Sequence, residues 1–268
     1  MSLLEPLRVP AAERTLRPVP QYSPGRILAL WAAVTLPMGL LAFVVGPLLA
    51  AHVDLHRGLL HWILMTVGMA WQCALSLLLL RREGALRWPE VKHRIRFTMP
   101  ADPRTDEPRA RLWWWVLPAM AANLALGFAA GPLVTVWGRV TGLAEPEWAN
   151  IQSLGSPEFV GQWWILALAL VSCAFNYVLG EELFFRGVLL PRMEGAFGRW
   201  DWVVNSVLFG LYHVHKIWFW PAMILGSLGH AWVARRHRSL GMAMVVHGVE
   251  GVVLIALVAA VVGGWWLP

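Results

Sequence analysis

Two adjacent carboxylates and an arginine stand within an otherwise apolar stretch, NYVLGEELFFRGVLL at 176–190. An ionisable group inside a membrane span costs at least a few kcal/mol, so such groups are functional candidates. On a helix, Glu182 and Arg186 are four residues apart and can form an ion pair, whereas Glu181 is rotated from Glu182 by about 100°. We therefore expect a structural pair between Glu182 and Arg186, and an unpaired carboxylate at Glu181.

Two histidines in other apolar segments, His213 and His247, fall at nearly the same depth as Glu181. With 1.5 Å of rise per residue, Glu181 is roughly 15 Å from Pro191 at its helix end. The same rise places His213 roughly 18 Å from Asp201, and His247 roughly 12 Å from Ser239. Three separate helices are thus expected to form one buried polar site.

A carboxylate and two imidazoles around one water molecule can hydrolyse a peptide bond. Two acidic or imidazole bases that face one water can deprotonate it, while a second imidazole donates a hydrogen bond to the oxyanion. An unpaired carboxylate such as Glu181 in a low-dielectric site is a strengthened base. The same three residues, Glu181, His213 and His247, could instead hold Zn²⁺. No HExxH motif decides between these alternatives. A serine mechanism lacks a GxSG-type serine in a span, and an aspartyl mechanism lacks paired intramembrane aspartates.

Supporting residues are expected on the histidine-bearing helices. Asn205 and Phe209 precede His213 by eight and four residues, and therefore share its helix face. Glu250 lies one turn beyond His247 and either orients it or pairs with a cation. His230 is expected to hydrogen-bond a neighbour. His61 and His215 are placed near helix ends, and His215 is expected to point away from the site.

The composition is that of a polytopic membrane protein. Of the 268 residues, 58% are hydrophobic and only 14% are charged, and the mean hydropathy is +0.56. The basic pI is then explained by Lys and Arg placed on the cytoplasmic side, so no nucleic-acid partner is expected. Cys73 and Cys173 lie in apolar runs and form no metal-binding or redox motif.

Seven membrane spans, with eight as the alternative, are predicted for an all-α bundle. The windows are 27–51, 59–80, 112–137, 163–190, 201–216, 217–234 and 239–264. Residues 1–26 have no signal-peptide pattern and are predicted to be a cytoplasmic tail. Residues 27–164 would form N-terminal transmembrane helices with a basic cytoplasmic loop at 81–111, and residues 165–264 the catalytic core.

Positive charge predicts the orientation of the chain. With a cytoplasmic N-terminus, every basic residue outside Arg57, Arg139 and Lys216 falls on the cytoplasmic side. Tryptophan runs at 113–115, 163–164 and 265–266 are expected to mark helix ends at the lipid headgroups. The 81–111 loop, with its mixture of basic and aromatic residues, is expected either to lie on the inner leaflet or to be a solvated linker.

Three motifs resemble those of the CPBP family of intramembrane endopeptidases, also called the CAAX-protease, Abi or Rce1-like family. They are EELFFR at 181–186 for EExxxR, FGLYH at 209–213 for FxxxH, and His247 for HxxxN or HxxxD. The resemblance covers roughly residues 165–260. The position of the family's Asn or Asp is occupied by Gly251, with Glu250 one residue before it, so Asn205 or a protonated Glu250 would have to substitute.

The resemblance implies a role for each matching residue. Glu181 would activate the water together with His213, and Glu182 and Arg186 would support the site electrostatically. His247 would help to form the oxyanion hole. A metal-free glutamate mechanism is favoured over the zinc-dependent version of the same protease.

The expected activity is endoproteolysis near the membrane-associated C-terminal region of a protein, in a bacterial inner membrane. The substrate would be a membrane protein, a lipidated protein or one with a C-terminal sorting tail, as in the myxosortase branch of the family. Two alternatives are a non-catalytic immunity or scaffold protein with the same fold, and a transporter whose buried charges line an ion path. Broken-helix repeats that would favour a transporter are not found in the sequence.

Overall fold

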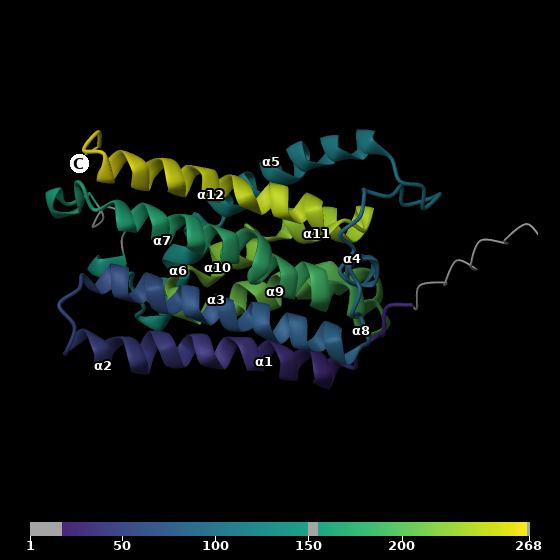
Figure 1. Ribbon diagram of the computed structural model, residues 1–268, viewed down its shortest axis with the longest axis horizontal. Coiled ribbons are helices and arrows are strands. Elements are labelled where there is room, and N and C mark those ends of the chain that lie inside the picture. The colour runs from purple at the N-terminus through teal and green to yellow at the C-terminus, as the bar shows by residue number, and fades with distance from the viewer. Residues whose placement is uncertain (1–17, 150–154, 267–268) are drawn as a thin grey trace, which may run out of the picture.

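The computed structural model describes residues 18–149 and 155–266 as an all-helical bundle, which confirms the predicted fold class (Figure 1). In these two ranges the only extended pairing is an isolated bridge between Ala101 and Pro108. The proposed N-terminal tail falls largely on residues 1–17, which lie outside the described ranges. The described chain continues from residue 18 and begins its first helix at Pro24.

In the described ranges, five helical segments are long and apolar enough to cross a membrane, and a bent pair would make six. Lying roughly parallel to the long axis in Figure 1, they contain α1 (Pro24–Leu40) with α2 (Gly46–Ala50), α3 (Arg57–Arg82), α5 (Val116–Ala129), α7 (Trp163–Ala174), and α12 (Leu240–Val262). The segment begun by α7 continues through two π-helical stretches to Arg192. The predicted count of seven or eight spans is therefore not confirmed.

Three of the predicted membrane-span windows do not form single straight helices. The 201–216 window contains α9 (Asp201–Tyr212), whose 12 residues extend about 18 Å, short of the roughly 30 Å of hydrocarbon. The 217–234 window is divided between α10 (Trp220–Leu225) and α11 (Leu228–His237). The 112–137 window ends one helix at Ala129, and Pro132 then stands at the start of α6 (Gly131–Thr141).

Helices α9, α10 and α11 form a hairpin inside the bundle. A 3₁₀ segment, Val214–Phe219, connects α9 to α10. The helical stretch Val214–Leu225 and the following helix α11 meet at a bend of 52°. The ring centroids of His215 in the hairpin and His61 in α3 are 5.9 Å apart. Since His61 is in the second turn of α3, the tip of the hairpin lies near the end of the bundle where α3 begins.

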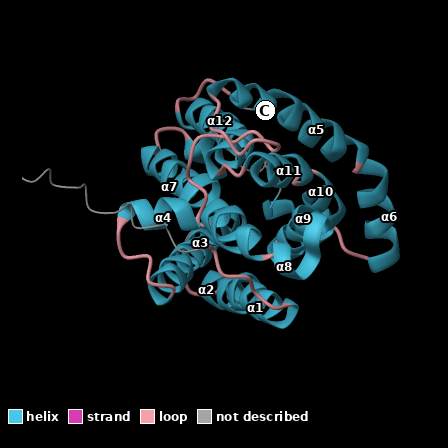
Figure 2. Cartoon of the chain, turned by 90° about the vertical axis from the view of Figure 1, so that its right-hand side faces the viewer, coloured by secondary structure: helices cyan, strands magenta, loops and turns pink. Residues whose placement is uncertain are grey.

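The opposite end of the bundle carries the predicted basic segments, including α4 (Trp88–Arg94) and α8 (Glu194–Phe197) (Figure 2). There Glu83 accepts hydrogen bonds from Tyr22 Oη at 2.5 Å and from Arg192 at 2.5 and 2.8 Å. Arg235 pairs with Asp201 at 2.5 Å. We call these five residues the polar cap, and its ion pairs join segments that are far apart in sequence.

The tryptophan runs do mark helix ends, as predicted. Trp113–Trp115 lie in a 3₁₀ turn before α5, Trp163 begins α7, and Trp265 follows the end of α12. In the 81–111 loop, Trp88 is exposed while Ile95 is buried. The loop is thus anchored to the bundle by Ile95 and presents an aromatic side chain outward.

Candidate active site

A cavity of about 610 Å³ inside the bundle is lined by Glu181, His213 and His247. The structure therefore brings together the three residues that the sequence placed at one depth. All three side chains are buried, with exposed fractions of 3%, 7% and 6%. A cavity of this size, with apolar walls and a few convergent polar groups, has the character of a small-molecule or peptide site.

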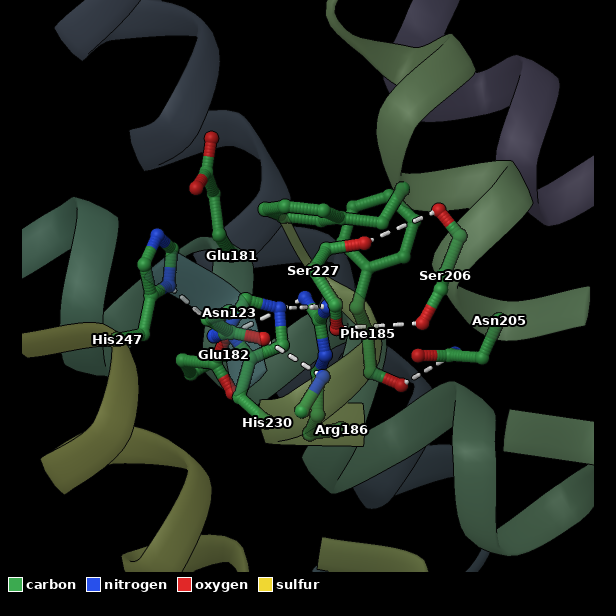
Figure 3. A network of polar contacts seen from close by, with 12 residues as sticks. Asn123, Glu181, Glu182, Phe185, Arg186, Asn205, Ser206, Ser227, His230 and His247 are labelled. Atoms are coloured by element: carbon green, nitrogen blue, oxygen red, sulfur yellow. Dashed lines mark hydrogen bonds and ion pairs between the residues drawn. The ribbon is translucent and has the colours of Figure 1, made fainter. Parts of the chain in front are cut away.

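The chain around Glu181 departs from regular α-helix on both sides. π-Helical stretches cover Phe175–Leu179 and Glu182–Leu189, with Gly180 between them. A Cβ atom on Gly180 would lie 2.7 Å from the Phe175 carbonyl oxygen and 3.0 Å from that of Met69, so only glycine fits. π-Helical turns are frequent at functional sites because they re-aim side chains. Here they accompany two neighbouring glutamates that point in different directions (Figure 3).

Glu181 faces His213 across the cavity. Its Oε1 atom lies 3.6 Å from Nε2 of His213, which is beyond a direct hydrogen bond. The other ring nitrogen of His213, Nδ1, is 2.8 Å from the Phe209 carbonyl oxygen. Because a carbonyl only accepts, Nδ1 carries a proton that it donates, and in the neutral ring the lone pair of Nε2 points toward Glu181.

The position of His213 depends on the end of a helix rather than on a continuous helix face. α9 ends at Tyr212, and His213 is the residue that caps it, with φ −74° and ψ 51°. Phe209 is on the last turn and packs its ring edge-on against His213, with centroids 4.7 Å apart. The predicted link between Phe209 and His213 is present, and it operates through both the ring and the carbonyl.

Glu182 points away from Glu181 and forms the ion pair with Arg186 that the sequence predicted, at 3.2 Å (Figure 3). Its Oε1 atom also lies 3.0 Å from Nδ1 of His247. His247 thus contacts Glu182 directly, whereas the sequence had placed it with Glu181. Since the carboxylate accepts from Nδ1, the Nε2 atom of His247 is available to the cavity.

Arg186 is held between groups from three elements. Its guanidinium donates to Nε2 of His230 in α11 and lies 4.0 Å above the ring of Phe209. Nδ1 of His230 is 3.5 Å from the amide nitrogen of Asn123 in α5. The expected hydrogen bond of His230 to a neighbour is confirmed. A buried guanidinium with a carboxylate, an imidazole and an aromatic face around it is compensated for its loss of water.

Asn205 belongs to the helix packing and is not placed at the cavity. Its amide nitrogen donates to the Phe185 carbonyl oxygen at 2.9 Å and lies 3.6 Å from the Met193 sulfur. These contacts tie α9 to the segment that carries Glu182. Of the two expected substitutes for the family's Asn or Asp, the structure places only Glu250 at the cavity.

Glu250 and Gly251 occupy the turn after His247. Glu250 is 67% exposed in its side chain, and its carboxylate is 3.9 Å from Nε2 of His247. A Cβ atom at Gly251 would lie 2.3 Å from the ring of Tyr177. The same ring packs edge-on against His247, with centroids 4.7 Å apart. Tyr177 therefore fills the space beside His247 that a larger side chain at 251 would need.

The sequence missed several residues of this cavity. His61 and His215 line it, although helix counting had directed His215 elsewhere. That count failed because the helix ends at Tyr212, so the direction of each later side chain changes. Tyr177, which lines the cavity, and Asn123, which lies against His230, were also missed. A polar Asn123 in the apolar 112–137 window was a usable signal.

A cluster of metal-binding residue types lies beside the cavity, but its members are not those expected for a zinc site. Among the described residues, Glu182, His230 and His247 have candidate ligand atoms within 4.8 Å of one another. Glu181 and His213 are not in this group. Arg186 contacts both Glu182 and His230, and a guanidinium in that position repels a divalent cation.

The described chain thus combines long apolar helices with an internal cavity that is lined by a carboxylate and imidazoles. Residues 162–265 match the family model described as Type II CAAX prenyl endopeptidase Rce1-like. The three motifs noted in the sequence all lie within this match, which supports the predicted relationship to the Rce1-like family. No curated protein and no solved structure matches the chain.

Proposed function

We propose that this integral membrane protein hydrolyses a peptide bond with a water molecule held between Glu181 and His213. The observation that carries the proposal is the 3.6 Å separation between Glu181 Oε1 and His213 Nε2. Two acceptors at this distance cannot bond each other, but the two O–H groups of one water can donate to both. As the water attacks a carbonyl carbon, one of these acceptors takes its proton.

His247 is assigned to the oxyanion that forms on the substrate carbonyl. Protonated on both nitrogens, it bonds Glu182 through Nδ1 and offers Nε2–H to the cavity. Glu182 balances the charge of this imidazolium, and Arg186 fixes the carboxylate of Glu182 in turn. On this assignment Glu182 and Arg186 are positioning residues, since neither needs to touch the substrate.

The proposed substrate is a protein whose C-terminal region is associated with the membrane, and lipidation of that region is compatible with the apolar cavity. The proposed location is a bacterial inner membrane with the N-terminus in the cytoplasm. The basic segments around the polar cap support this orientation, because short cytoplasmic loops are enriched in Lys and Arg.

A metal-free reaction is favoured over a zinc-dependent one on the geometry of Arg186. The cluster of Glu182, His230 and His247 would be the nearest ligand set for zinc. Two of its members, His230 and Glu182, are already bonded to the Arg186 guanidinium. In the described part of the chain, neither Glu181 nor His213 is bonded to an arginine. Their lone pairs are therefore best matched by the two protons of a water.

The test is co-expression with membrane-anchored reporters whose apolar C-terminal segments end in an epitope tag. Wild type is compared with Glu181→Gln and His213→Ala, and with Glu158→Gln as the matched control for loss of an exposed acid. Mass spectrometry of each reporter identifies the new C-terminus. We expect processing by wild type and Glu158→Gln, and rates lower by about 100-fold or more in the other two. Unchanged processing in both variants would contradict the proposal.

A further inference from the structure

The cavity extends from the catalytic residues toward the end of the bundle where α3 begins, and it also reaches the exposed Glu250 in α12. Gly58 and His61 in the first two turns of α3 line it, as do Glu145 and Lys216. Gly58 and His61 are more than twenty residues from Arg82, the end of α3 beside the polar cap. Of these four residues, Glu145 and Lys216 are exposed. The mouth of the cavity beside Glu145 and Lys216 is thus at the end of the bundle farthest from the polar cap.

Between the site and the polar cap the interior is filled. Every residue from Gly180 to Met193 is buried. Phe184, Phe185 and Leu189 in this stretch are 0% exposed. Arg192 then closes the end of the segment through its two hydrogen bonds to Glu83. A peptide approaching from the cap would have to displace both this packed layer and an ion-paired network.

The two ends differ in charge as well as in packing. The described basic residues at the cap end are Arg26, Arg81, Arg82, Arg87, Lys92, Arg94, Arg96, Arg104, Arg109, Arg111, Arg192, Arg199, Arg235, Arg236 and Arg238. The far end has Arg57, Arg139 and Lys216. Because short cytoplasmic loops carry the excess of Lys and Arg, the cap end is the cytoplasmic one and the mouth is on the outer face.

We propose that the substrate reaches the site from the outer face, so that the bond hydrolysed belongs to the exported side of a membrane-associated protein. This inference rests on the proposed function and adds the side from which the substrate arrives. A substrate presented only in the cytoplasm would meet the closed end of the bundle.

The walls of the cavity indicate the chemistry of the segment that enters. Beyond the histidines, they are largely sulfur-containing and aromatic side chains, which accept varied apolar groups. These residues are Met38, Trp62, Met65, Met69, Phe219 and Met223. Among the described residues that line the cavity, Lys216 is the only lysine or arginine. The segment is therefore expected to be apolar and extended, and to enter beside Lys216.

The test uses cysteine labelling on the two faces. In a background with Cys73 and Cys173 replaced by alanine, Lys216→Cys places a thiol at the mouth. Asp106→Cys places one at the cap end, where Asp106 is exposed and pairs with Arg238. A membrane-impermeant polyethylene-glycol maleimide is applied to spheroplasts and to inverted membrane vesicles. A tagged reporter whose apolar C-terminal segment faces outward measures cleavage.

We expect Lys216→Cys to react in spheroplasts and Asp106→Cys only in inverted vesicles. Labelling Lys216→Cys should lower reporter cleavage by about tenfold or more, while labelling Asp106→Cys should leave it unchanged. Reaction of Lys216→Cys only in inverted vesicles, or full cleavage by the labelled protein, would overturn the inference. Absence of cleavage by unlabelled wild type would instead count against the proposed function, and the sidedness of labelling would still test the access route.

Discussion

The Nδ1 atom of His247 lies 3.0 Å from a carboxylate oxygen of Glu182. This contact assigns different work to two acids that are neighbours in sequence. Glu182 is fully buried and is bonded to Arg186 and His247, whereas Glu181 lines the cavity. Removing the Glu182 carboxylate should therefore affect mainly the stability of the fold and the position of His247. Removing the Glu181 carboxylate should affect mainly the rate of the reaction.

The first prediction concerns Glu182→Gln. The change leaves the Arg186 guanidinium buried without its carboxylate, which is expected to cost about 3–5 kcal/mol. Thermal unfolding of the detergent-purified protein should show a clear decrease in Tm, accompanied by loss of cleavage. Glu181→Gln is the matched comparison, and it should retain the wild-type Tm. Equal decreases in Tm for the two variants would contradict the separation of roles.

The second prediction concerns the glycine beside Tyr177. Gly251→Ala adds a methyl group 2.3 Å from the tyrosine ring, and overpacking of this kind costs about 1–3 kcal/mol. Because that ring packs against His247, cleavage should fall as well. Gly248→Ala is the control one turn earlier, where the nearest atom to the new methyl would be 4.0 Å away.

Gly248→Ala should be neutral or stabilising by up to about 1 kcal/mol, as expected for alanine in a helix. The double variant Gly251→Ala/Tyr177→Leu separates steric from chemical effects, since leucine can yield to the new methyl group. Recovery of Tm in this double variant is expected. A wild-type Tm and cleavage rate for Gly251→Ala alone would show that Tyr177 does not constrain His247.

The third prediction is a pH dependence of stability at the polar cap. Burial raises the pKa of the Glu83 carboxyl, but hydrogen bonds from Arg192 and Tyr22 lower it more, so the net pKa is below the ordinary value of 4.5. Burial and then the bond to Glu83 raise the pKa of Tyr22 to about 12. Tyr22 therefore remains a donor at neutral pH.

A lowered pKa in the folded state means that ionised Glu83 stabilises the fold above pH 4.5, and that this stabilisation is lost as the pH falls through the folded-state value. Glu83→Gln should lower stability by about 1.5–3 kcal/mol at neutral pH. The difference in Tm from wild type should diminish below pH 4.5. A difference that stays constant from neutral pH to pH 3 would rule out this role for the Glu83 charge.

Much of the site could be predicted because buried charge is rare in an apolar sequence. Glu181, Glu182 and Arg186 stand out on composition alone, and their spacing correctly separated the pair from the unpaired acid. The depth of His213 and His247 followed from helix rise. These predictions depend on local geometry within one helix, where the sequence is most informative.

The features of the fold and site that could not be predicted depend on where helices end. Apolar windows do not reveal that α9 stops at Tyr212 or that the chain bends between α10 and α11, so the predicted number of spans was not confirmed. For the same reason His215 was directed away from the cavity. The contact of His247 with Glu182 instead of Glu181 is a matter of side-chain packing between two helices, which spacing along one chain does not determine.

The fourth prediction concerns metal. Because Arg186 occupies the cluster of Glu182, His230 and His247, we expect the purified, active protein to contain less than about 0.1 zinc per chain by elemental analysis. Treatment with a chelator should leave the cleavage rate of a reporter unchanged. One zinc per chain, lost together with activity in His230→Ala, would contradict the metal-free account.

The central claim is that Glu181 activates the attacking water, and the most direct measurement is the single-turnover cleavage rate of one reporter by wild type and Glu181→Gln at equal protein concentration. Glutamine keeps the size of the side chain but removes a general base worth about 10²–10⁴ in rate. The account predicts a decrease of at least about 100-fold with an unchanged Tm. Cleavage by Glu181→Gln at the wild-type rate would contradict it.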